Sequence, residues 1–380
     1  MADRYQIIRR GRGSIVKVPE LAEKLGITRP LIVGSGHLTG HLLKKVPALL
    51  AAPVFSGYHP NPDLHDALPG TEMFRKGMCD GIISIGGGSA MDTAKAVEAI
   101  LIAGSEEKAL EGRFPETAGI PHLAIPGTAG TGAEATQNAV VYVSNRKYSL
   151  SHPLLRPAGV ILDSELLETL PEYHKKSAAL DALSQGIESY WSRSATEDSR
   201  IHAYLAVLGV LDNLKAYLAG DAHAADEMLD AAFQSGKAIQ LTRTTAAHAM
   251  SYQLTKQMGI AHGHACLLTL PVLWEQMQNR ADTKSLLQDL GRKMRLSEPQ
   301  IVPKLLRGIL YDLQMEIPAM PDEKEIDALA DSVDPDRLGN HPVAMTRKDV
   351  RETYRQAFMP LCAAEKQACM DIWNYYSEQI

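Results

Sequence analysis

Short apolar runs separated by helical stretches dominate the first 165 residues of this 380-residue chain. Most of these runs are rich in Val and Ile and stop at glycine or proline, as buried strands do. The predicted strands lie at 30–36, 52–55, 81–85, 122–126, 139–143 and 159–163. Because strands that alternate with helices build parallel sheets, this half of the chain is predicted to be a doubly wound α/β domain.

The character of the chain changes after about residue 165. From Pro171 onward, Ala and Leu recur with the 3.6-residue period of helices, and few runs resemble strands. The stretch 203–211 is apolar on most sides, as a helix buried in a bundle would be. We therefore expect two domains, an α/β domain over residues 1–165 and an all-α domain over residues 166–380.

Composition excludes several classes of protein. The 39 Lys and Arg against 45 Asp and Glu give a net charge of −6, so no general positive field favours a nucleic-acid partner. No apolar run reaches the ~20 residues that cross a bilayer, and the first residues lack the basic and apolar segments of a secretory signal. Four scattered cysteines without a CxxC pair suggest neither a disulfide scaffold nor a zinc ribbon. We expect a cytoplasmic protein that binds neither nucleic acid nor membrane.

Two glycine-rich segments follow predicted strands. Gly86, Gly87 and Gly88 precede a helix whose predicted N-cap is Ser89, and Gly and Thr are interleaved in residues 126–136. Glycine lets a backbone approach a phosphate closely, and a helix start supplies free N–H groups. Since ligands of parallel sheets bind beyond the carboxyl ends of strands, the two segments together predict a phosphate or pyrophosphate site. Taken singly, each could instead be a tight turn or a flexible surface loop.

Polar side chains stand out in the helical half. Asp181 and Gln185 are four residues apart and share one helix face. His248 lies in an otherwise bland helix, and His262 and His264 precede an apolar run. One carboxylate and two imidazoles could hold iron or zinc with an open position for a substrate. The alternative is that these histidines are structural.

Together these segments resemble the iron-containing (group III) alcohol dehydrogenase family. The run GGGSAMDTAK matches its cofactor motif, PGTAGTGAEAT is similar to its second cofactor loop, and two histidines keep its fourteen-residue step. The resemblance implies a Rossmann-like α/β N-terminal domain and an all-α C-terminal domain, the dehydroquinate synthase-like architecture. It also implies NAD(H) or NADP(H), a divalent metal (Fe²⁺ or Zn²⁺) in a cleft between the domains, and a homodimer. The implied cofactor-binding residues are Ser35, Gly86, Gly87, Gly88, Ser89, Asp92, Thr128, Thr131 and Lys147, and the implied metal ligands are Asp181, Gln185, His248 and His262.

Three positions depart from the family pattern. Gln185 replaces the usual second-ligand histidine, and because an amide oxygen is a neutral, weaker ligand, we expect metal affinity or identity to differ. Tyr252 stands where a histidine often lies near the reacting carbonyl, and its phenol has a reference pKa of about 10. Ser35 stands where many members carry an Asp that binds the adenosine ribose. Without a carboxylate to repel a 2′-phosphate, NADPH fits at least as well as NADH.

Residues 146–153, 181–192 and 242–255 resemble the branch of the family that reduces phosphonoacetaldehyde to 2-hydroxyethylphosphonate. The expected reaction is the reduction of a small anionic aldehyde by NAD(P)H, with a metal that polarises the carbonyl. The alternatives are a metal-independent reductase, or a dehydrogenase of another small aldehyde or alcohol, such as sulfoacetaldehyde, a semialdehyde or a simple alcohol. A non-redox NAD- and zinc-dependent lyase of the dehydroquinate synthase type and a non-enzymatic binding protein also stay open.

Four side chains are candidates for contact with the substrate. Tyr252 and His264 are candidate catalytic residues that protonate the product, with water as the alternative donor. Lys147, Arg243 and His264 could face a phosphonate dianion. Alternatively, Lys147 serves the cofactor and Arg243 pairs with a surface carboxylate.

Overall fold

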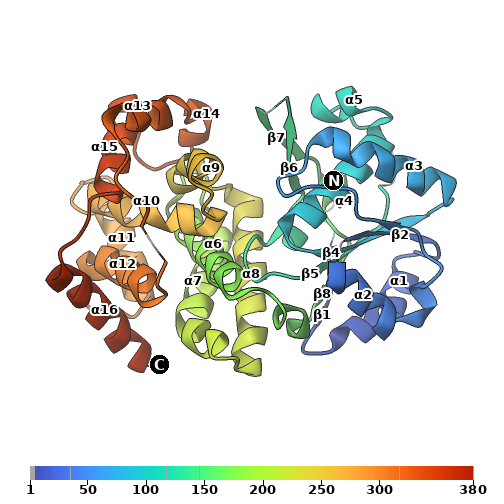
Figure 1. The fold of residues 1–380 in the computed structure, drawn as a ribbon, viewed down its shortest axis with the longest axis horizontal. Helices are drawn as coiled ribbons and strands as arrows, with labels where there is room; N and C mark the ends of the chain where they lie inside the picture. Colours follow the sequence, from blue (N-terminus) through green and yellow to red (C-terminus); the bar gives the residue numbers. More distant parts are fainter. Residues whose placement is uncertain (1–4, 35, 117–118, 145, 316, 380) are drawn as a thin grey trace. The chain divides into compact units, whose positions relative to one another are not determined.

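The computed structural model describes residues 5–34, 36–116, 119–144, 146–315 and 317–379. The chain divides into two compact units, Met1–Leu170 and Pro171–Ile380, which run from blue to green and from green to red in Figure 1. The boundary expected near residue 165 lies a few residues before this division.

A six-stranded parallel sheet forms the centre of the first unit. Its strands are β1 (Ile7–Arg10), β2 (Pro30–Gly34), β3 (Val54–Phe55), β4 (Gly81–Gly86), β5 (His122–Pro126) and β8 (Gly159–Leu162). They lie in the order β1-β8-β5-β4-β2-β3, and every neighbouring pair is parallel. The predicted doubly wound α/β domain is confirmed. The edge strand β1 was not predicted, because two of its four residues are arginines.

Helices cover both faces of this sheet (Figure 1). They are α1 (Val18–Lys24), α2 (Gly36–Lys45), α3 (Leu68–Lys76), α4 (Gly88–Ala103) and α5 (Glu106–Leu110), with 3-10 turns η1 (Ser14–Lys17), η2 (Pro47–Leu49), η3 (Leu64–Ala67), η4 (Ala133–Ala135), η5 (Pro153–Leu155) and η6 (Ser164–Leu167). In β2, Ile32 faces a core shared with α1 and α2, whereas Leu31 and Val33 face a core shared with α4. Because both faces are buried, the central strands read as continuous apolar runs in the sequence.

One predicted strand is not part of the parallel sheet. β6 (Asn138–Val143) pairs antiparallel with β7 (Arg146–Ser151) in a separate hairpin, so the expectation that residues 139–143 continue the parallel series is wrong. Only Ala139 and Val141 of β6 are buried, and they pack into the core beside α4. Such one-sided burial is typical of a hairpin that lies over a core, but the apolar run of β6 concealed the alternation.

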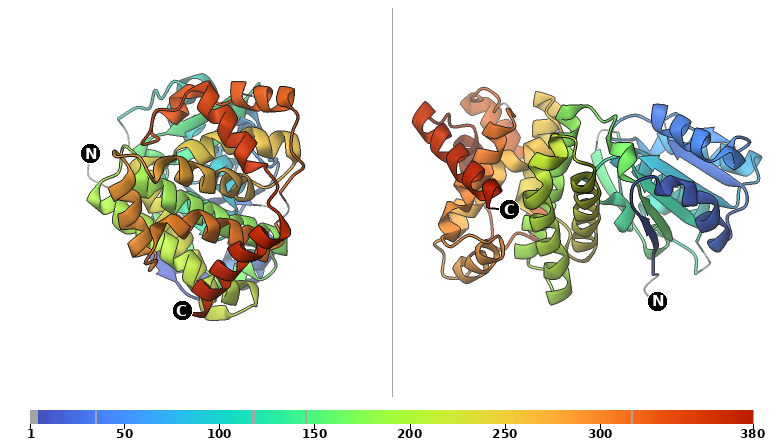
Figure 2. Two further views of the ribbon diagram at one scale, coloured as in Figure 1. Left: turned by 90° about the vertical axis from the view of Figure 1, so that its left-hand side faces the viewer. Right: turned by 90° about the horizontal axis from the view of Figure 1, so that it is seen from below.

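Helices make up the regular structure described in the second unit. They are α6 (Glu172–Trp191), α7 (Glu197–Leu218), α8 (Ala222–Thr242), α9 (Ala246–Met258), α10 (His262–Met277), α11 (Lys284–Lys293), α12 (Val302–Asp312), α13 (Glu323–Asp331), α14 (Pro335–Leu338), α15 (Arg347–Ala357) and α16 (Ala363–Glu378), with η7 (Pro299–Ile301). Helices α6, α7 and α8 pack side by side (Figure 2), and α10 contacts α6, α9, α12 and α15. The predicted all-α domain is confirmed. In the described part of the chain, no helix has the length and apolar character needed to cross a membrane.

Candidate active site

The two glycine-rich segments of the first unit meet at the carboxyl ends of β4 and β5. Gly86 lies opposite Pro126 in the sheet, and the Gly127 N–H donates to the Gly86 carbonyl at 2.8 Å. A Cβ added at Gly87 would lie 3.2 Å from Thr128 Cγ2, and one at Gly88 would lie 3.0 Å from Thr131 Cγ2. The glycines therefore let the two predicted cofactor segments pack directly against each other.

Helix α4 begins inside the first of these segments. Its N-cap is Gly87, and no described side chain caps it, so the prediction that Ser89 is the N-cap is wrong by two positions. Ser89 instead lies in the first turn, where its Oγ accepts from the Asn61 N–H at 3.3 Å. The uncapped N–H groups of the first turn and the positive end of the helix dipole suit a phosphate.

Lys95, on helix α4, holds the second glycine-rich segment in place through hydrogen bonds. Its buried ammonium donates to the Ala133 carbonyl at 2.7 Å, to Thr136 Oγ1 at 3.1 Å and to the Asn138 carbonyl at 2.8 Å. Burial lowers the pKa of Lys95 to about 8, although Asp92 and other nearby carboxylates oppose this shift. Lys95 was not predicted as a site residue, although a lysine between Ala94 and Ala96 on a buried helix indicates a positioned charge.

Asp92 and Lys147 interact electrostatically beside the same segment. Burial raises the pKa of Asp92 to about 6, while the positive charges of Lys95 and Lys147 and the Val140 N–H oppose the rise. Lys147 lies on β7 opposite Tyr142 of β6. The structure thus brings Lys147 to the predicted cofactor segments of the first unit.

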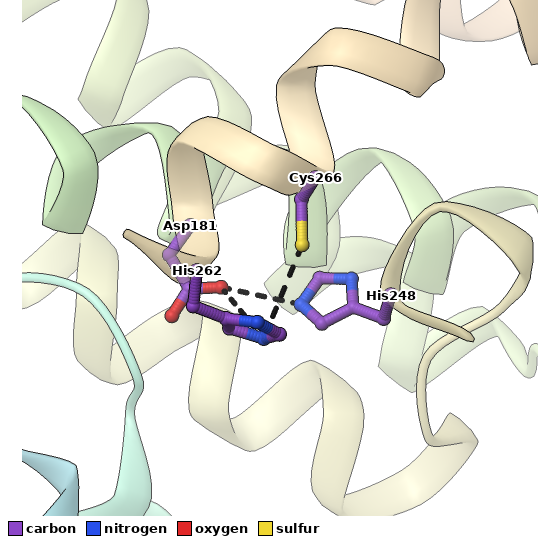
Figure 3. A group of neighbouring side chains, drawn as sticks. All are labelled: Asp181, His248, His262 and Cys266. Carbon is purple, nitrogen blue, oxygen red and sulfur yellow. Dashed lines mark hydrogen bonds and ion pairs between the residues drawn. The ribbon is translucent and has the colours of Figure 1, made fainter. Parts of the chain in front are cut away.

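In the second unit, four side chains from three helices point toward one another (Figure 3). Asp181 comes from α6, His248 from α9, and His262 and Cys266 from α10. Their donor atoms all lie within 4.8 Å of one another. Asp181 Oδ1 is 3.2 Å from His248 Nε2 and 3.9 Å from His262 Nε2, and Cys266 Sγ is 3.9 Å from the same His262 nitrogen. Three of the four predicted metal ligands therefore lie together. The Cys266 thiol, which was not predicted, lies with them.

A glycine sets the distance between the two helices that carry most of this group. A Cβ at Gly263 would lie 2.0 Å from the Ser177 carbonyl oxygen and 2.5 Å from the Asp181 nitrogen. Only glycine permits this approach, so the first turn of α10 lies directly on α6. This contact brings His262 to Asp181.

Hydrogen bonds fix which nitrogen of each imidazole carries the proton. Glu188 accepts from His248 Nδ1, and its carboxylate is held by the Thr245 hydroxyl at 2.5 Å and the Ala247 N–H at 2.8 Å. Ser251 Oγ donates to the His248 carbonyl at 2.8 Å and so accepts from His262 Nδ1 at 3.1 Å. When the imidazoles are neutral, both Nε2 atoms therefore present a lone pair toward the Asp181 carboxylate.

The charges around the group favour a cation at its centre. Burial works to lower the pKa of His248, but Cys266, Glu188 and Asp181 raise it well above its ordinary value. Burial also works to raise the pKa of Cys266, but the two histidines lower it to about 7. A metal ion can replace the protons that these groups share, so one carboxylate, two imidazoles and a thiol of lowered pKa fit a divalent metal ion. The His262 side chain is 35% exposed, so the group is reached from that side.

The fourth predicted ligand, Gln185, lies one turn after Asp181 on α6. It is buried, and its Oε1 lies 2.7 Å from the Ser235 hydroxyl of α8, which is also 2.8 Å from the Ala232 carbonyl. Glu188 continues the same helix face. The spacing 181, 185, 188 could have identified Glu188, and the step from His262 to Cys266 is likewise one helical turn.

The two candidate proton donors occupy different surroundings. Tyr252 stacks on His262 with ring centroids 5.5 Å apart, and Arg337 Nη1 donates to its hydroxyl at 3.5 Å. Burial raises the pKa of Tyr252, so the phenol keeps its proton. His264 lies outside the four-donor group, with Nδ1 3.2 Å from the Tyr173 hydroxyl.

Arg243 is not brought to the four-donor group. It is exposed, it adopts a φ of +61°, and it lines a shallow surface depression with Arg193 and Asn340. Arg193 follows the end of α6, so this depression lies roughly 15 Å along the helix axis from Asp181. Ser35, the predicted ribose-binding position, is outside the described residues.

Known proteins resemble both units of this chain. The family model "Iron-containing alcohol dehydrogenase" matches residues 6–164, and "Fe-containing alcohol dehydrogenase family, C-terminal" matches residues 176–358. Phosphonoacetaldehyde reductase from Streptomyces viridochromogenes is 38% identical over 205 residues, which make up 50% of this chain and 51% of that protein. The chain thus spans about half the length of this relative.

Two other relatives match along nearly the whole chain. Lactaldehyde reductase from Escherichia coli is 28% identical over 377 residues, 92% of this chain and 97% of that protein. The crystal structure of sulfoacetaldehyde reductase from Bifidobacterium kashiwanohense in complex with NAD⁺ has a TM-score of 0.86 at 28% identity and covers 93% of this chain and 97% of its own. Since the two family models cover most of both units, this chain belongs to the iron-containing alcohol dehydrogenase family.

Proposed function

We propose that this chain reduces a small anionic aldehyde to its alcohol with NADH or NADPH, and that phosphonoacetaldehyde, which would give 2-hydroxyethylphosphonate, is the first substrate to test. The observation that carries the proposal is the four-donor group of the second unit, whose donor atoms converge beside a phenol that keeps its proton. The glycine-rich segments of the first unit support the cofactor part of the proposal.

The first unit would bind the cofactor. The backbone of Gly86, Gly87, Gly88 and Ser89 would hold the pyrophosphate at the start of α4, and Thr128, Thr131, Asp92 and Lys147 would contact the rest of the cofactor. Bound NAD(P)H would supply the hydride that the carbonyl carbon accepts. Because Ser35 carries no carboxylate to repel a 2′-phosphate, we expect NADPH to serve as well as NADH.

The second unit would bind the aldehyde oxygen. Asp181, His248 and His262 would hold a divalent ion, Fe²⁺ or Zn²⁺, which would polarise the carbonyl as a Lewis acid. Glu188 keeps the His248 proton on Nδ1, so that Nε2 stays available as a ligand. Tyr252 holds its proton beside His262 and would donate it to the product oxygen, with His264 as the second candidate.

An anionic substrate needs a cation near this group. Arg337 meets the need better than Arg243, because its guanidinium lies 5.2 Å from the Tyr252 ring, which itself stacks on His262. An arginine fork suits a phosphonate or a sulfonate. The similarity to phosphonoacetaldehyde and sulfoacetaldehyde reductases favours the same class of substrate.

A panel of aldehydes tests the proposal. Phosphonoacetaldehyde, sulfoacetaldehyde, succinic semialdehyde and propanal are assayed with NADH and NADPH after loading with Fe²⁺ or Zn²⁺. We expect an anionic aldehyde to be preferred, chelation and His248→Ala to abolish turnover, and Arg337→Met to raise KM for anionic aldehydes only, whereas Arg243→Met leaves KM unchanged. Turnover that survives chelation would favour a metal-independent reductase, and a preference for propanal would refute the anionic substrate. The absence of NAD(P)H oxidation with every aldehyde would refute the reductase.

A further inference from the structure

We propose that the Cys266 thiolate, rather than the Gln185 amide, is the fourth protein ligand of the metal. The inference rests on the proposed metal site and adds a residue that neither the sequence pattern nor the family resemblance assigned. It makes the donor set one carboxylate, two imidazoles and one thiolate, so that the aldehyde oxygen would enter as a fifth ligand.

The Cys266 side chain lies where a fourth metal ligand would lie. It follows His262 by one turn of α10, its side chain is buried, and it points at the same centre as His248 and His262 (Figure 3). Metal bonds of about 2.0–2.3 Å to O, N and S place the donors of a tetrahedral site roughly 3.3–3.8 Å apart. The observed separations of 3.2 and 3.9 Å from Asp181 Oδ1 to the two imidazoles, and 3.9 Å from Cys266 Sγ to His262, lie close to that range.

The side-chain amide of Gln185 contacts a residue outside the four-donor group. Its Oε1, the only atom of the amide able to bind a cation, lies 2.7 Å from the Ser235 hydroxyl, whose single proton also has the Ala232 carbonyl as an acceptor at 2.8 Å. Binding metal through this oxygen would require the amide to leave Ser235 or turn over. Cys266 needs no such rearrangement.

The ligand chemistry also favours the thiol. A thiolate carries a full negative charge and is a soft donor, whereas an amide oxygen is neutral and weak. Coordination breaks the Cys266 S–H bond, releases the proton to solvent and forms an S–metal bond, with no change in oxidation state. Asp181 and Cys266 together balance the charge of a divalent ion. The site should therefore prefer Zn²⁺, Co²⁺ or Fe²⁺ strongly over Mg²⁺.

Cobalt spectroscopy of the full-length protein tests the proposal without relying on turnover. A thiolate bound to Co²⁺ gives an intense near-ultraviolet charge-transfer band, which O and N ligands do not give. We compare the wild type with Cys266→Ser, Cys266→Ala, Gln185→Ala and Cys369→Ser. Cys369 is a matched control, because it is the other cysteine of this unit that lies buried in a described helix. Circular dichroism and thermal unfolding check the fold of each variant.

We expect the band in the wild type, Gln185→Ala and Cys369→Ser, and its loss in both Cys266 variants. We also expect metal affinity in the Cys266 variants to fall by more than the roughly 10–100-fold seen when a group that only orients a ligand is removed. A wild type that binds cobalt without the band, or a band that survives in the Cys266 variants, would overturn the proposal. So would a Gln185→Ala protein that no longer binds cobalt while the Cys266 variants bind it normally.

The two proposals can fail separately. If aldehyde turnover is present but the cobalt band is absent, the reductase stands and the thiolate ligand is wrong. If the band is present but no aldehyde is reduced, the ligand assignment stands and the reductase is wrong. If the wild type binds no cobalt at all, both the thiolate ligand and the metal-dependent mechanism are refuted.

Discussion

At the scale of single residues, Glu188 decides whether His248 can serve as a metal ligand. Its carboxylate is buried, and burial alone would raise its pKa, but the charge of His248 and the hydrogen bonds from His248 and Thr245 hold the pKa below its usual range. An ionised carboxylate can only accept, so the His248 proton must be on Nδ1. A neutral His248 thereby presents Nε2 as its ligand nitrogen.

Glu188→Gln should weaken metal binding by roughly 10–100-fold. The new amide would either present an N–H₂ group to His248 Nδ1 and shift the imidazole proton to Nε2, or turn that group against the Thr245 and Ala247 donors. Affinity is measured by competition with a chelator. Glu275→Gln, which changes a glutamate of α10 paired with Arg307, should leave affinity unchanged. Equal affinities in wild type and Glu188→Gln would contradict the positioning role.

Glu134 makes the stability of the first unit depend on pH. Burial raises its pKa to about 7 from an ordinary value of 4.5, although Lys95 opposes the rise. Between these two values the folded chain keeps a proton that the unfolded chain has released, so stability falls as the pH rises through this window and stays reduced above it. Glu134→Gln has no such titration.

The unfolding midpoint of Glu134→Gln should therefore rise relative to that of the wild type as the pH is raised from about 4.5 to about 7, and the difference should then level off. Thermal melts followed by circular dichroism across this range measure it. Glu107→Gln, an exposed glutamate on α5, is the control and should follow the wild type. Parallel profiles for Glu134→Gln and wild type would show that burial of this carboxyl does not control stability.

The candidate site was only partly predictable from residue patterns. The residue pattern made Asp181, His248 and His262 candidates, and the family resemblance implied that they are ligands. The helix-face rule would also have found Glu188 and Cys266. The approach of α10 to α6 at Gly263 could not be predicted, because it depends on two helices that are distant in the sequence. Which polar residue joins a cluster is a property of packing, not of local pattern.

At the scale of elements, the buried strands were the most predictable parts of the chain. β2, β4, β5 and β8 are apolar on both faces and end at turns, and both features are visible in the sequence. β6 was assigned to the wrong sheet because strand propensity does not specify a pairing partner. The hairpin nevertheless carries Lys147 to the predicted cofactor segments.

A glycine with positive φ lies beside each end of helix α4, so the same substitution can be compared at the two ends. Gly86, with a φ of +146°, precedes the helix, and a Cβ there would lie 2.8 Å from Ala90 Cβ; Gly104, with a φ of +87°, is the C-cap in open space. Alanine at either position should cost about 1 kcal/mol or more through backbone strain. Only Gly86→Ala should also weaken NADH binding, because it alters the segment proposed to hold the pyrophosphate.

Fluorescence titration with NADH and thermal unfolding separate these effects. Gly104→Ala serves as the control for strain alone. A Gly86→Ala protein that is destabilised but binds NADH like the wild type would remove this segment from the proposed cofactor site.

At the scale of the whole molecule, the two units divide the proposed chemistry. Helix α4 and the loop after β5 lie in Met1–Leu170, and the four-donor group lies in Pro171–Ile380. Each ligand should therefore stabilise its own set of elements by mass action, whatever the other ligand does.

Hydrogen exchange of the full chain tests whether each ligand protects the elements of its own unit. Zn²⁺ at a hundredfold excess over its Kd should stabilise its binding elements by about 2.7 kcal/mol and slow exchange in α6, α9 and α10. NADH should slow exchange in residues 86–92 and 126–136. In Asp181→Asn the response to Zn²⁺ should disappear while the response of these two segments to NADH persists, because the carboxylate lies in the four-donor group of the second unit. Loss of both responses in Asp181→Asn would show that NADH binding to the first unit depends on the metal in the second unit.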